Sequence, residues 1–146
     1  MMFTLIICTY MRPNALLNLL NSIKEQTLYP DKILIIDGSI DKETKTILQK
    51  HSIPNLDYYQ VKESDRGLTK QRNFGIAKVP SETEVVCFLD DDTVLDENYF
   101  DTTVLKSMIV EGEINSVNFK SKDVMLKPIY RVLTDMNKVE GKEDTY

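Results

Sequence analysis

The segment Glu84–Asp92, EVVCFLDDD, joins a short apolar run to three consecutive carboxylates. The run from Val85 to Leu89 has the length and composition of a strand buried on both faces, as in a parallel sheet covered by helices. Ligands of open α/β sheets bind just outside the carboxyl ends of such strands. The sequence therefore predicts an α/β fold whose functional site begins at Asp90.

The three aspartates favour a cation at that position. Asp90, Asp91 and Asp92 would repel one another, and burying their charges is costly unless a cation shares the site. A divalent metal with oxygen ligands, Mg²⁺ or Mn²⁺, would satisfy them while binding a phosphorylated ligand. A solvated acidic turn that caps the next helix is the alternative, and the acids alone do not decide between the two.

Composition restricts the class of protein. A chain of 146 residues with 42% hydrophobic residues and few glycines and prolines is expected to fold as one domain with its own core. Its net charge of −5, without a basic patch, argues against nucleic-acid binding. The first apolar run is too short to span a membrane and lacks a basic lead-in, so neither a transmembrane segment nor a signal peptide is predicted. Two cysteines in predicted buried strands favour reduced thiols and a cytoplasmic location, and one histidine excludes a zinc cluster.

Three further strand-and-helix units precede the acidic strand. Buried strands are predicted at Phe3–Cys8 and Lys32–Ile36, and a third strand is predicted at Asn55–Lys62. Helices are predicted at Asn14–Gln26, from Asp41 as N-cap to about Lys50, and at Leu68–Ala77. Such units in series imply parallel strands, right-handed crossovers and helices on both faces of the sheet.

The pattern weakens after the acidic strand. A helix is predicted over Asp96–Val110, with its first residue as N-cap, and a further strand over Glu113–Phe119. Asp123–Leu133 is compatible with either strand or helix. We therefore divide the chain into a core, residues 1–120, and a short, weakly patterned C-terminal segment, residues 121–146.

Polar side chains follow every predicted strand and would converge on one edge of a parallel sheet. They are Thr9, Tyr10 and Arg12 after the first strand, Asp37 and Ser39 after the second, Glu63, Asp65 and Arg66 after the third, and the three aspartates after the fourth. Opposed cations and acids suggest a ligand that carries phosphate and hydrogen-bond donors. Each residue also has a structural alternative: Asp37 could accept from the backbone at Ser39 in an Asx-turn, and Arg72 and Asn73 could lie on an exposed helix face.

Four segments, in this order and spacing, resemble the nucleotide-sugar-dependent glycosyltransferases of family 2, which have the GT-A fold. They are TLIICTYMRP (4–13), ILIIDGSID (33–41), RGLTKQRNFGI (66–76) and VVCFLDDD (85–92), within a resemblance that runs from about Phe3 to Phe119. The resemblance implies a GT-A-like (Rossmann-like), mostly parallel sheet with a short C-terminal part. It implies transfer of a sugar from a nucleotide-diphosphate donor to an acceptor hydroxyl. UDP is favoured, GDP and dTDP stay open, and the acceptor is an unidentified saccharide, lipid or protein.

The resemblance also implies a role for each candidate residue. The residues that would frame the nucleotide base are Thr9, Tyr10, Arg12 and Asp37. Those that would lie near the base, ribose or diphosphate are Arg72, Asn73, Asp90 and Asp91, with Asp90 nearest the ribose. Asp92, the last residue of the D-x-D pattern, would hold the Mn²⁺ or Mg²⁺ that binds the diphosphate.

The reaction implied by the resemblance inverts the anomeric centre and needs a carboxylate base, which in relatives lies well downstream of the D-x-D pattern. Here the late acidic pair is Glu143–Asp144, which makes Asp144 the candidate base. A fragment of a longer enzyme, a minimal transferase and a chain completed by a partner all fit so short an acceptor side. The main alternative function is a non-catalytic nucleotide-sugar-binding module. A receiver-like signalling domain is disfavoured, because no acid follows the first strand.

Overall fold

Five strands form one sheet in the computed structural model, which describes residues 2–100 and 131–133. Their order is β3-β2-β1-β4-β5, and each strand is parallel to its neighbours. The strands are β1 (Phe3–Thr9), β2 (Lys32–Asp37), β3 (Leu56–Gln60), β4 (Val85–Asp90) and β5 (Arg131–Leu133). The predicted mostly parallel α/β sheet is confirmed.

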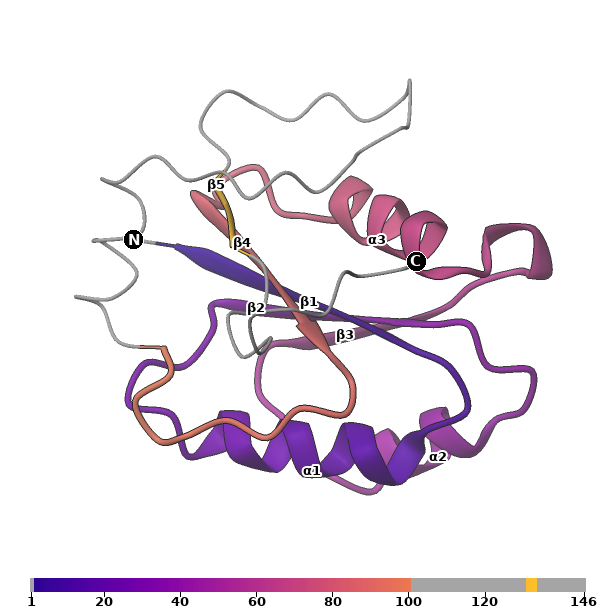
Figure 1. Cartoon of the computed structure of the whole chain (residues 1–146), viewed down its shortest axis with the longest axis horizontal. Coiled ribbons are helices and arrows are strands. Elements are labelled where there is room, and N and C mark those ends of the chain that lie inside the picture. Colours follow the sequence, from indigo (N-terminus) through magenta and orange to yellow (C-terminus); the bar gives the residue numbers. More distant parts are fainter. Residues whose placement is uncertain (1, 101–130, 134–146) are drawn as a thin grey trace, which may run out of the picture.

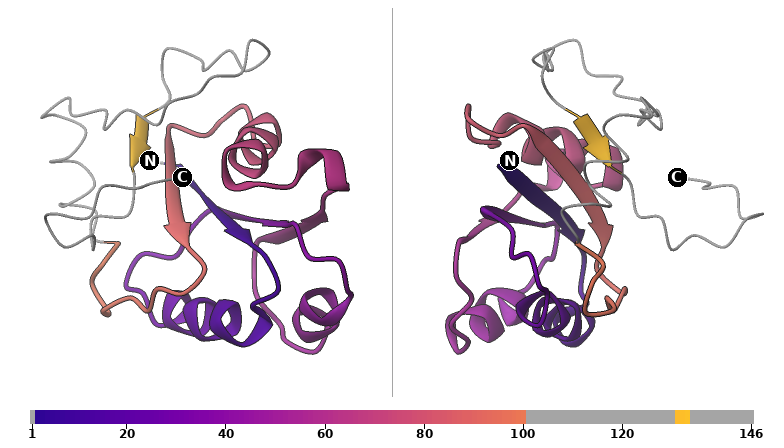
Figure 2. Two further views of the ribbon diagram at one scale, coloured as in Figure 1. Left: turned by 45° about the vertical axis from the view of Figure 1, so that its right-hand side comes forward. Right: turned by 90° about the vertical axis from the view of Figure 1, so that its left-hand side faces the viewer.

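Helices cover both faces of this sheet, as predicted (Figure 1). They are α1 (Pro13–Lys24), α2 (Glu43–Gln49) and α3 (Leu68–Ala77), with the 3₁₀ turn η1 (Glu63–Asp65) before α3. Figure 2 shows α1 and α2 together against one face and α3 against the other. The carboxyl ends of β1, β2 and β4 therefore meet between two layers of helices.

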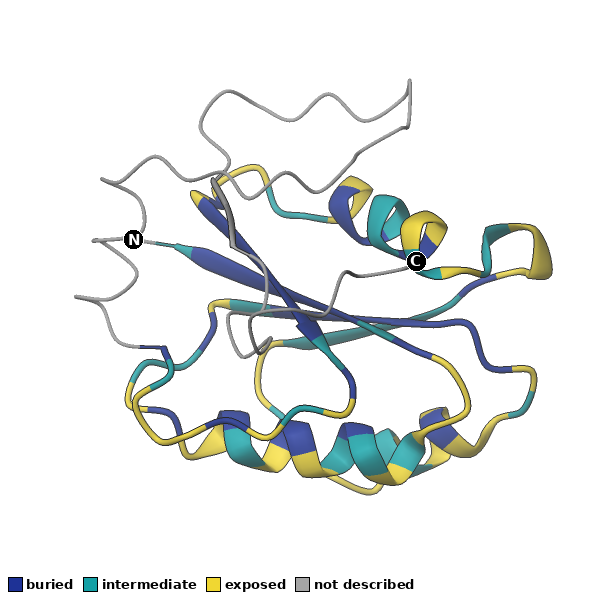
Figure 3. Ribbon diagram, in the orientation of Figure 1, coloured by how far each residue is buried: buried dark blue, intermediate teal, exposed yellow. Residues whose placement is uncertain are grey.

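The alternation of β1 divides the core in two. Leu5 and Ile7 pack with Leu19 and Leu20 of α1, whereas Ile6 packs with Ile76 of α3 and its neighbours on the other face. Successive strand side chains point to opposite faces, so an uninterrupted apolar run is needed when both faces are covered. Figure 3 shows β1 and β4 buried along nearly their whole length, with exposure concentrated on the outer faces of the helices. The sheet is thus a rigid base for whatever follows its strands.

Two predicted helix starts differ from the structure. Asp41 is not the N-cap of α2: the helix begins at Glu43 after Lys42, and Asp41 Oδ1 accepts from the Glu43 N–H at 3.1 Å. Residues 97–100 form turns instead of the first turns of the helix expected after Asp96. The reason is tertiary, since the amide of Gln26 donates to the Asp96 carbonyl and accepts from the Phe100 N–H at 2.9 Å.

The C-terminal predictions are tested only in part. Arg131–Leu133 pairs with β4 as a strand, which is one of the two alternatives for that stretch. The rest of the predicted helix, the predicted strand at Glu113–Phe119 and the pair Glu143–Asp144 lie outside the described residues, and the division at residue 120 stays a prediction. In the part of the chain that the structure describes, no helix has the length and apolar character to cross a bilayer.

Candidate functional site

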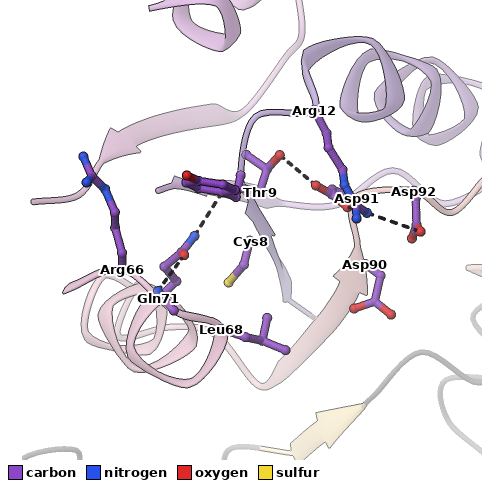
Figure 4. A pocket seen from close by; sticks show the side chains of 11 residues that line it. Cys8, Thr9, Arg12, Arg66, Leu68, Gln71, Asp90, Asp91 and Asp92 are labelled. Atoms are coloured by element: carbon purple, nitrogen blue, oxygen red, sulfur yellow. Dashed lines mark hydrogen bonds and ion pairs between the residues drawn. The ribbon is translucent and has the colours of Figure 1, made fainter. Parts of the chain in front are cut away.

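A pocket of about 690 Å³ opens at the carboxyl ends of β1 and β4, beside the start of α3. Its walls are formed by Cys8, Thr9, Tyr10, Arg12, Arg66, Gly67, Leu68, Gln71, Asp90, Asp91 and Asp92 (Figure 4). The edge of the sheet that the sequence predicted as the functional site is therefore hollowed. Six of the nine predicted site residues in the described chain line it: the three after β1 and the three aspartates.

The loops after β1 and β4 are joined by a polar network that runs from buried Thr9 and Asp91 to exposed Arg12 and Asp92. Thr9 Oγ1 donates to Asp91 Oδ2 at 2.9 Å, and Arg12 Nη1 lies 3.3 Å from Asp91 Oδ1. The same Arg12 nitrogen lies 3.5 Å from Asp92 Oδ2, and Figure 4 shows the guanidinium directed between the two carboxylates. This contact forms because β1 and β4 are adjacent in register, with Cys8 opposite Asp90. The acid cluster is partly neutralised by the chain itself.

Asp91 and Asp92 differ sharply in environment. The side chain of Asp91 is 10% exposed and that of Asp92 is 61% exposed. Both Asp91 oxygens have partners, so this residue holds the two loops together. Asp92 contacts Arg12 at the long distance given above, which leaves its oxygens accessible from the pocket.

Asp91 gives a testable pH dependence. Burial raises its pKa above the ordinary 3.8, Thr9 and Arg12 oppose the rise, and the Asp92 charge adds to it. Because the pKa of Asp91 is higher in the folded than in the unfolded chain, protonation of this carboxyl stabilises the fold. This stabilisation is complete below the unfolded-state pKa of 3.8 and is lost as the pH rises through the folded-state pKa. We expect the free energy of unfolding of Asp91→Asn, relative to the wild type, to increase over that range. Urea denaturation of both proteins from acid to neutral pH measures it, and a pH-independent difference would contradict the raised pKa.

Arg72 and Asn73 lie on α3 outside the pocket wall. Arg72 Nη2 is 3.7 Å from Asp90 Oδ1, and its guanidinium lies over the ring of Phe88, 5.3 Å from the centroid. Asn73 Oδ1 is buried and has no hydrogen-bond partner among the described residues. Arg72 thus reaches the site through Asp90, and the predicted nucleotide contacts of both residues stay predictions.

Asp37 is completely buried at the end of β2 and does not line the pocket. Its Oδ1 accepts from the Ser39 N–H at 2.8 Å, which is the Asx-turn considered as the structural alternative. Its Oδ2 accepts from the Tyr58 hydroxyl at 2.6 Å. Burial, followed by this bond to the carboxylate, raises the pKa of Tyr58. The assignment of Asp37 to the nucleotide base stays a prediction, and the structure gives the residue a bracing role.

That brace continues into the loop after β1. Ser39 Oγ accepts from the Met11 N–H at 2.8 Å, and Met11 has a φ of 55°, a left-handed conformation that is unfavourable for this residue type. Strain of this kind persists only where neighbouring contacts fix the backbone. The bond from Ser39 therefore helps to hold Tyr10 and Arg12 at the pocket.

The sequence did not single out Gln71 or Cys8 as pocket residues. Gln71 is the third buried side chain of the site, and its contacts are described below. Cys8 and Cys87 are both free, as expected, and burial raises the pKa of each thiol to about 12. A thiol of that pKa is protonated at neutral pH, so Cys8 is a wall of the pocket and not a nucleophile.

The donor set suits a hard divalent cation that is shared with a ligand. Over residues 2–100 and 131–133, no group of three or more histidine, cysteine, aspartate or glutamate side chains is arranged to hold a metal. Mg²⁺ and similar ions are commonly held by one or two carboxylates together with substrate phosphates. The exposed carboxylate of Asp92, with Asp90 beside it in the wall, fits that kind of site.

A family model described as Glycosyl transferase family 2 matches residues 4–143. The chain belongs to this family. The match extends past the resemblance expected from the motifs and covers the described strand β5. In this family 2 chain, the pocket is formed by the loop after β1, the aspartates after β4 and the start of α3.

The chain corresponds to only part of the length of each relative described here. The O-antigen chain rhamnosyltransferase RfbN of Salmonella typhimurium is 31% identical over 109 residues, which are 75% of this family 2 chain and 32% of that protein. The crystal structure of S. aureus TarS superposes with a TM-score of 0.61 at 25% identity, over 76% of this chain and 20% of that one. TarS in complex with UDP gives a TM-score of 0.59 at 25% identity, over 80% of this chain and 33% of that one. The complex with UDP-GlcNAc gives 0.58 at the same identity, with 80% and 32% covered.

Proposed function

We propose that this family 2 chain forms the donor side of a glycosyltransferase, which moves a sugar from a nucleotide-diphosphate donor to an acceptor hydroxyl. The observation that carries the proposal is the pocket, where exposed Asp92, buried Asp91 and the cation Arg12 meet at the carboxyl ends of adjacent strands. Such a combination suits a ligand that carries both a diphosphate and hydrogen-bonding groups.

UDP is the nucleotide that we favour, because TarS has been solved with UDP and with UDP-GlcNAc. GDP and dTDP remain alternatives, because no single residue of the site identifies which nucleotide base is bound. In our proposal the ring of Tyr10, which is 52% exposed in the wall, packs beside the base. Arg12 and Arg66 line the same pocket and offer charge to the diphosphate.

The chemistry follows from the charge that develops on the leaving diphosphate. A divalent cation, Mn²⁺ or Mg²⁺, would be held by Asp92 with Asp90, and it would supply Lewis-acid stabilisation of that charge. The helix α3 begins at Leu68 in the pocket wall, so its partially positive N-terminal end also lies close to a bound diphosphate. Thr9 and Arg12 would keep Asp91 in place while the ligand enters.

The acceptor side of the proposed reaction requires a base. An inverting displacement needs a base for the acceptor hydroxyl, and Asp144 is the candidate that the sequence offers. The chain spans about a third of the curated relative, so the whole enzyme's acceptor is not inferred from it. A non-catalytic nucleotide-sugar-binding module would use the same pocket without turnover.

The first test is calorimetric titration of UDP, GDP and dTDP into the full chain with Mn²⁺, and again with EDTA. We expect one nucleotide to bind about tenfold or more tightly with Mn²⁺, a gain of about 1.4 kcal/mol or more. Absence of binding by all three, from a cooperatively folded sample, would overturn the donor-site proposal. If UDP does bind, release of UDP from UDP-GlcNAc by the chain would favour a transferase over a binding module.

A further inference from the structure

We infer that Gln71 is the positioning residue of the donor pocket, a conclusion that rests on the proposed function. Gln71 lies on α3, is 4% exposed and lines the pocket between the ends of β1 and β2. No charge resides on it, and its chemistry is entirely that of a primary amide with two N–H donors and one oxygen acceptor.

Both N–H donors and the oxygen of this amide form hydrogen bonds with backbone groups. Its Nε2 donates to the carbonyl of Thr9 at 3.1 Å and to the carbonyl of Ile36 at 2.9 Å. Its Oε1 accepts from the N–H of Gly67 at 3.1 Å. One side chain therefore ties together the end of β1, the end of β2 and the residue before α3. Figure 4 shows Gln71 beside Thr9 in the pocket wall.

The close fit at Gly38 supports a fixed position for this amide. A Cβ at Gly38 would lie 2.7 Å from Gln71 Oε1 and 3.2 Å from its Cδ, which is closer than ordinary contacts allow. The Gly38 N–H also donates to the Thr9 carbonyl, at 2.9 Å. Two donors, one from α3 and one from the segment after β2, thus converge on the Thr9 carbonyl.

The position of Thr9 determines the position of Asp91, to which its hydroxyl donates a hydrogen bond. The backbone of Thr9 is held by Gln71, while its hydroxyl donates to Asp91, the neighbour of Asp92. A displacement of Thr9 would therefore pass directly to the carboxylates that face a diphosphate. Misplacement of binding groups by about 1 Å can cost as much as about a hundredfold in rate. Gln71 acts on the donor through these residues and does not need to touch it.

The test compares Gln71→Met, which keeps the length of the side chain and removes all three hydrogen bonds, with Ile23→Val. Ile23 is a buried residue of α1 outside the pocket, so its variant reports general destabilisation. Two quantities are measured in the full chain, below the melting transition of both variants. They are the affinity for UDP with Mn²⁺ and the hydrogen-exchange rate of the Gly38 amide.

We expect Gln71→Met to weaken UDP binding by about tenfold, which corresponds to about 1.4 kcal/mol. We also expect it to speed exchange at Gly38, and Ile23→Val to change neither beyond its general loss of stability. Equal UDP affinities in the two variants would overturn the positioning role. Faster exchange at Gly38 without a loss of affinity would leave Gln71 as a structural residue only. If the wild type binds UDP, GDP and dTDP no better than buffer, the donor site itself fails, and the exchange data still show whether the amide holds the loops.

Discussion

Asp92→Asn is expected to abolish the advantage that Mn²⁺ gives to nucleotide binding while leaving the fold intact. The substitution removes a charged oxygen ligand for the cation. Residues that merely support metal ligands contribute about ten- to a hundredfold to metal affinity, so a direct ligand is expected to contribute at least about a hundredfold. Because the side chain is 61% exposed, the free energy of unfolding should change by less than about 0.5 kcal/mol.

Asp57→Asn is the matched control for this experiment. Asp57 lies on β3 outside the pocket and, like Asp92, is a solvent-accessible aspartate paired with a cation; its side chain is 43% exposed and lies 2.6 Å from Lys32. Titration of UDP with Mn²⁺ and with EDTA, together with urea denaturation, is carried out on both variants. A metal-dependent affinity that survives in Asp92→Asn would remove this residue from the cation site. A large loss in Asp57→Asn would show that net charge, and not the site, governs binding.

The parts of the fold that the sequence predicted well are those set by local pattern. The apolar runs of β1, β2 and β4 were placed within a residue or two, because a strand buried on both faces forms a nearly continuous apolar run in the sequence. The bounds of α3 agree with the prediction, and its pocket position follows from the order of the strands. The place of a residue directly after a strand thus determined whether it lies at the edge formed by the carboxyl ends of the sheet.

Orientation at that edge could not be predicted, because it depends on partners distant in sequence. Thr9 and Asp37 occupy the same register position on adjacent strands and are both buried, yet Thr9 lines the pocket and Asp37 does not. The Thr9 hydroxyl donates to Asp91 across the site, whereas Asp37 accepts a hydrogen bond from the Tyr58 hydroxyl on β3. The role of Gln71 could not be predicted from the sequence either, since a glutamine on a helix is ordinarily exposed. Only the approach of Gly38 and two strand ends makes it part of the site.

The second large effect is expected for Asp37→Ala, which should lower the free energy of unfolding by about 3 kcal/mol. The variant leaves the Ser39 N–H without its partner in a buried position and the Tyr58 hydroxyl without its partner in a partly buried one. Urea denaturation measures the loss. Tyr58→Phe, which removes one of the two bonds but leaves the carboxylate on Ser39, should cost clearly less. An equal cost in both variants would contradict a separate contribution from the Asx-turn.

The same variant decides how Asp37 serves the nucleotide. We expect Asp37→Ala to weaken UDP binding even in EDTA, and equal metal-free affinities would remove Asp37 from the base pocket. A loss alone leaves two routes, direct contact with the base or the brace through Ser39 to Met11. Ser39→Ala separates them, because it removes the bond to the Met11 N–H and leaves the Asp37 carboxylate in place. The burial of Asp37 favours the brace, in which case Ser39→Ala reproduces most of the loss. Full affinity in Ser39→Ala would instead require the carboxylate to become accessible when the nucleotide binds.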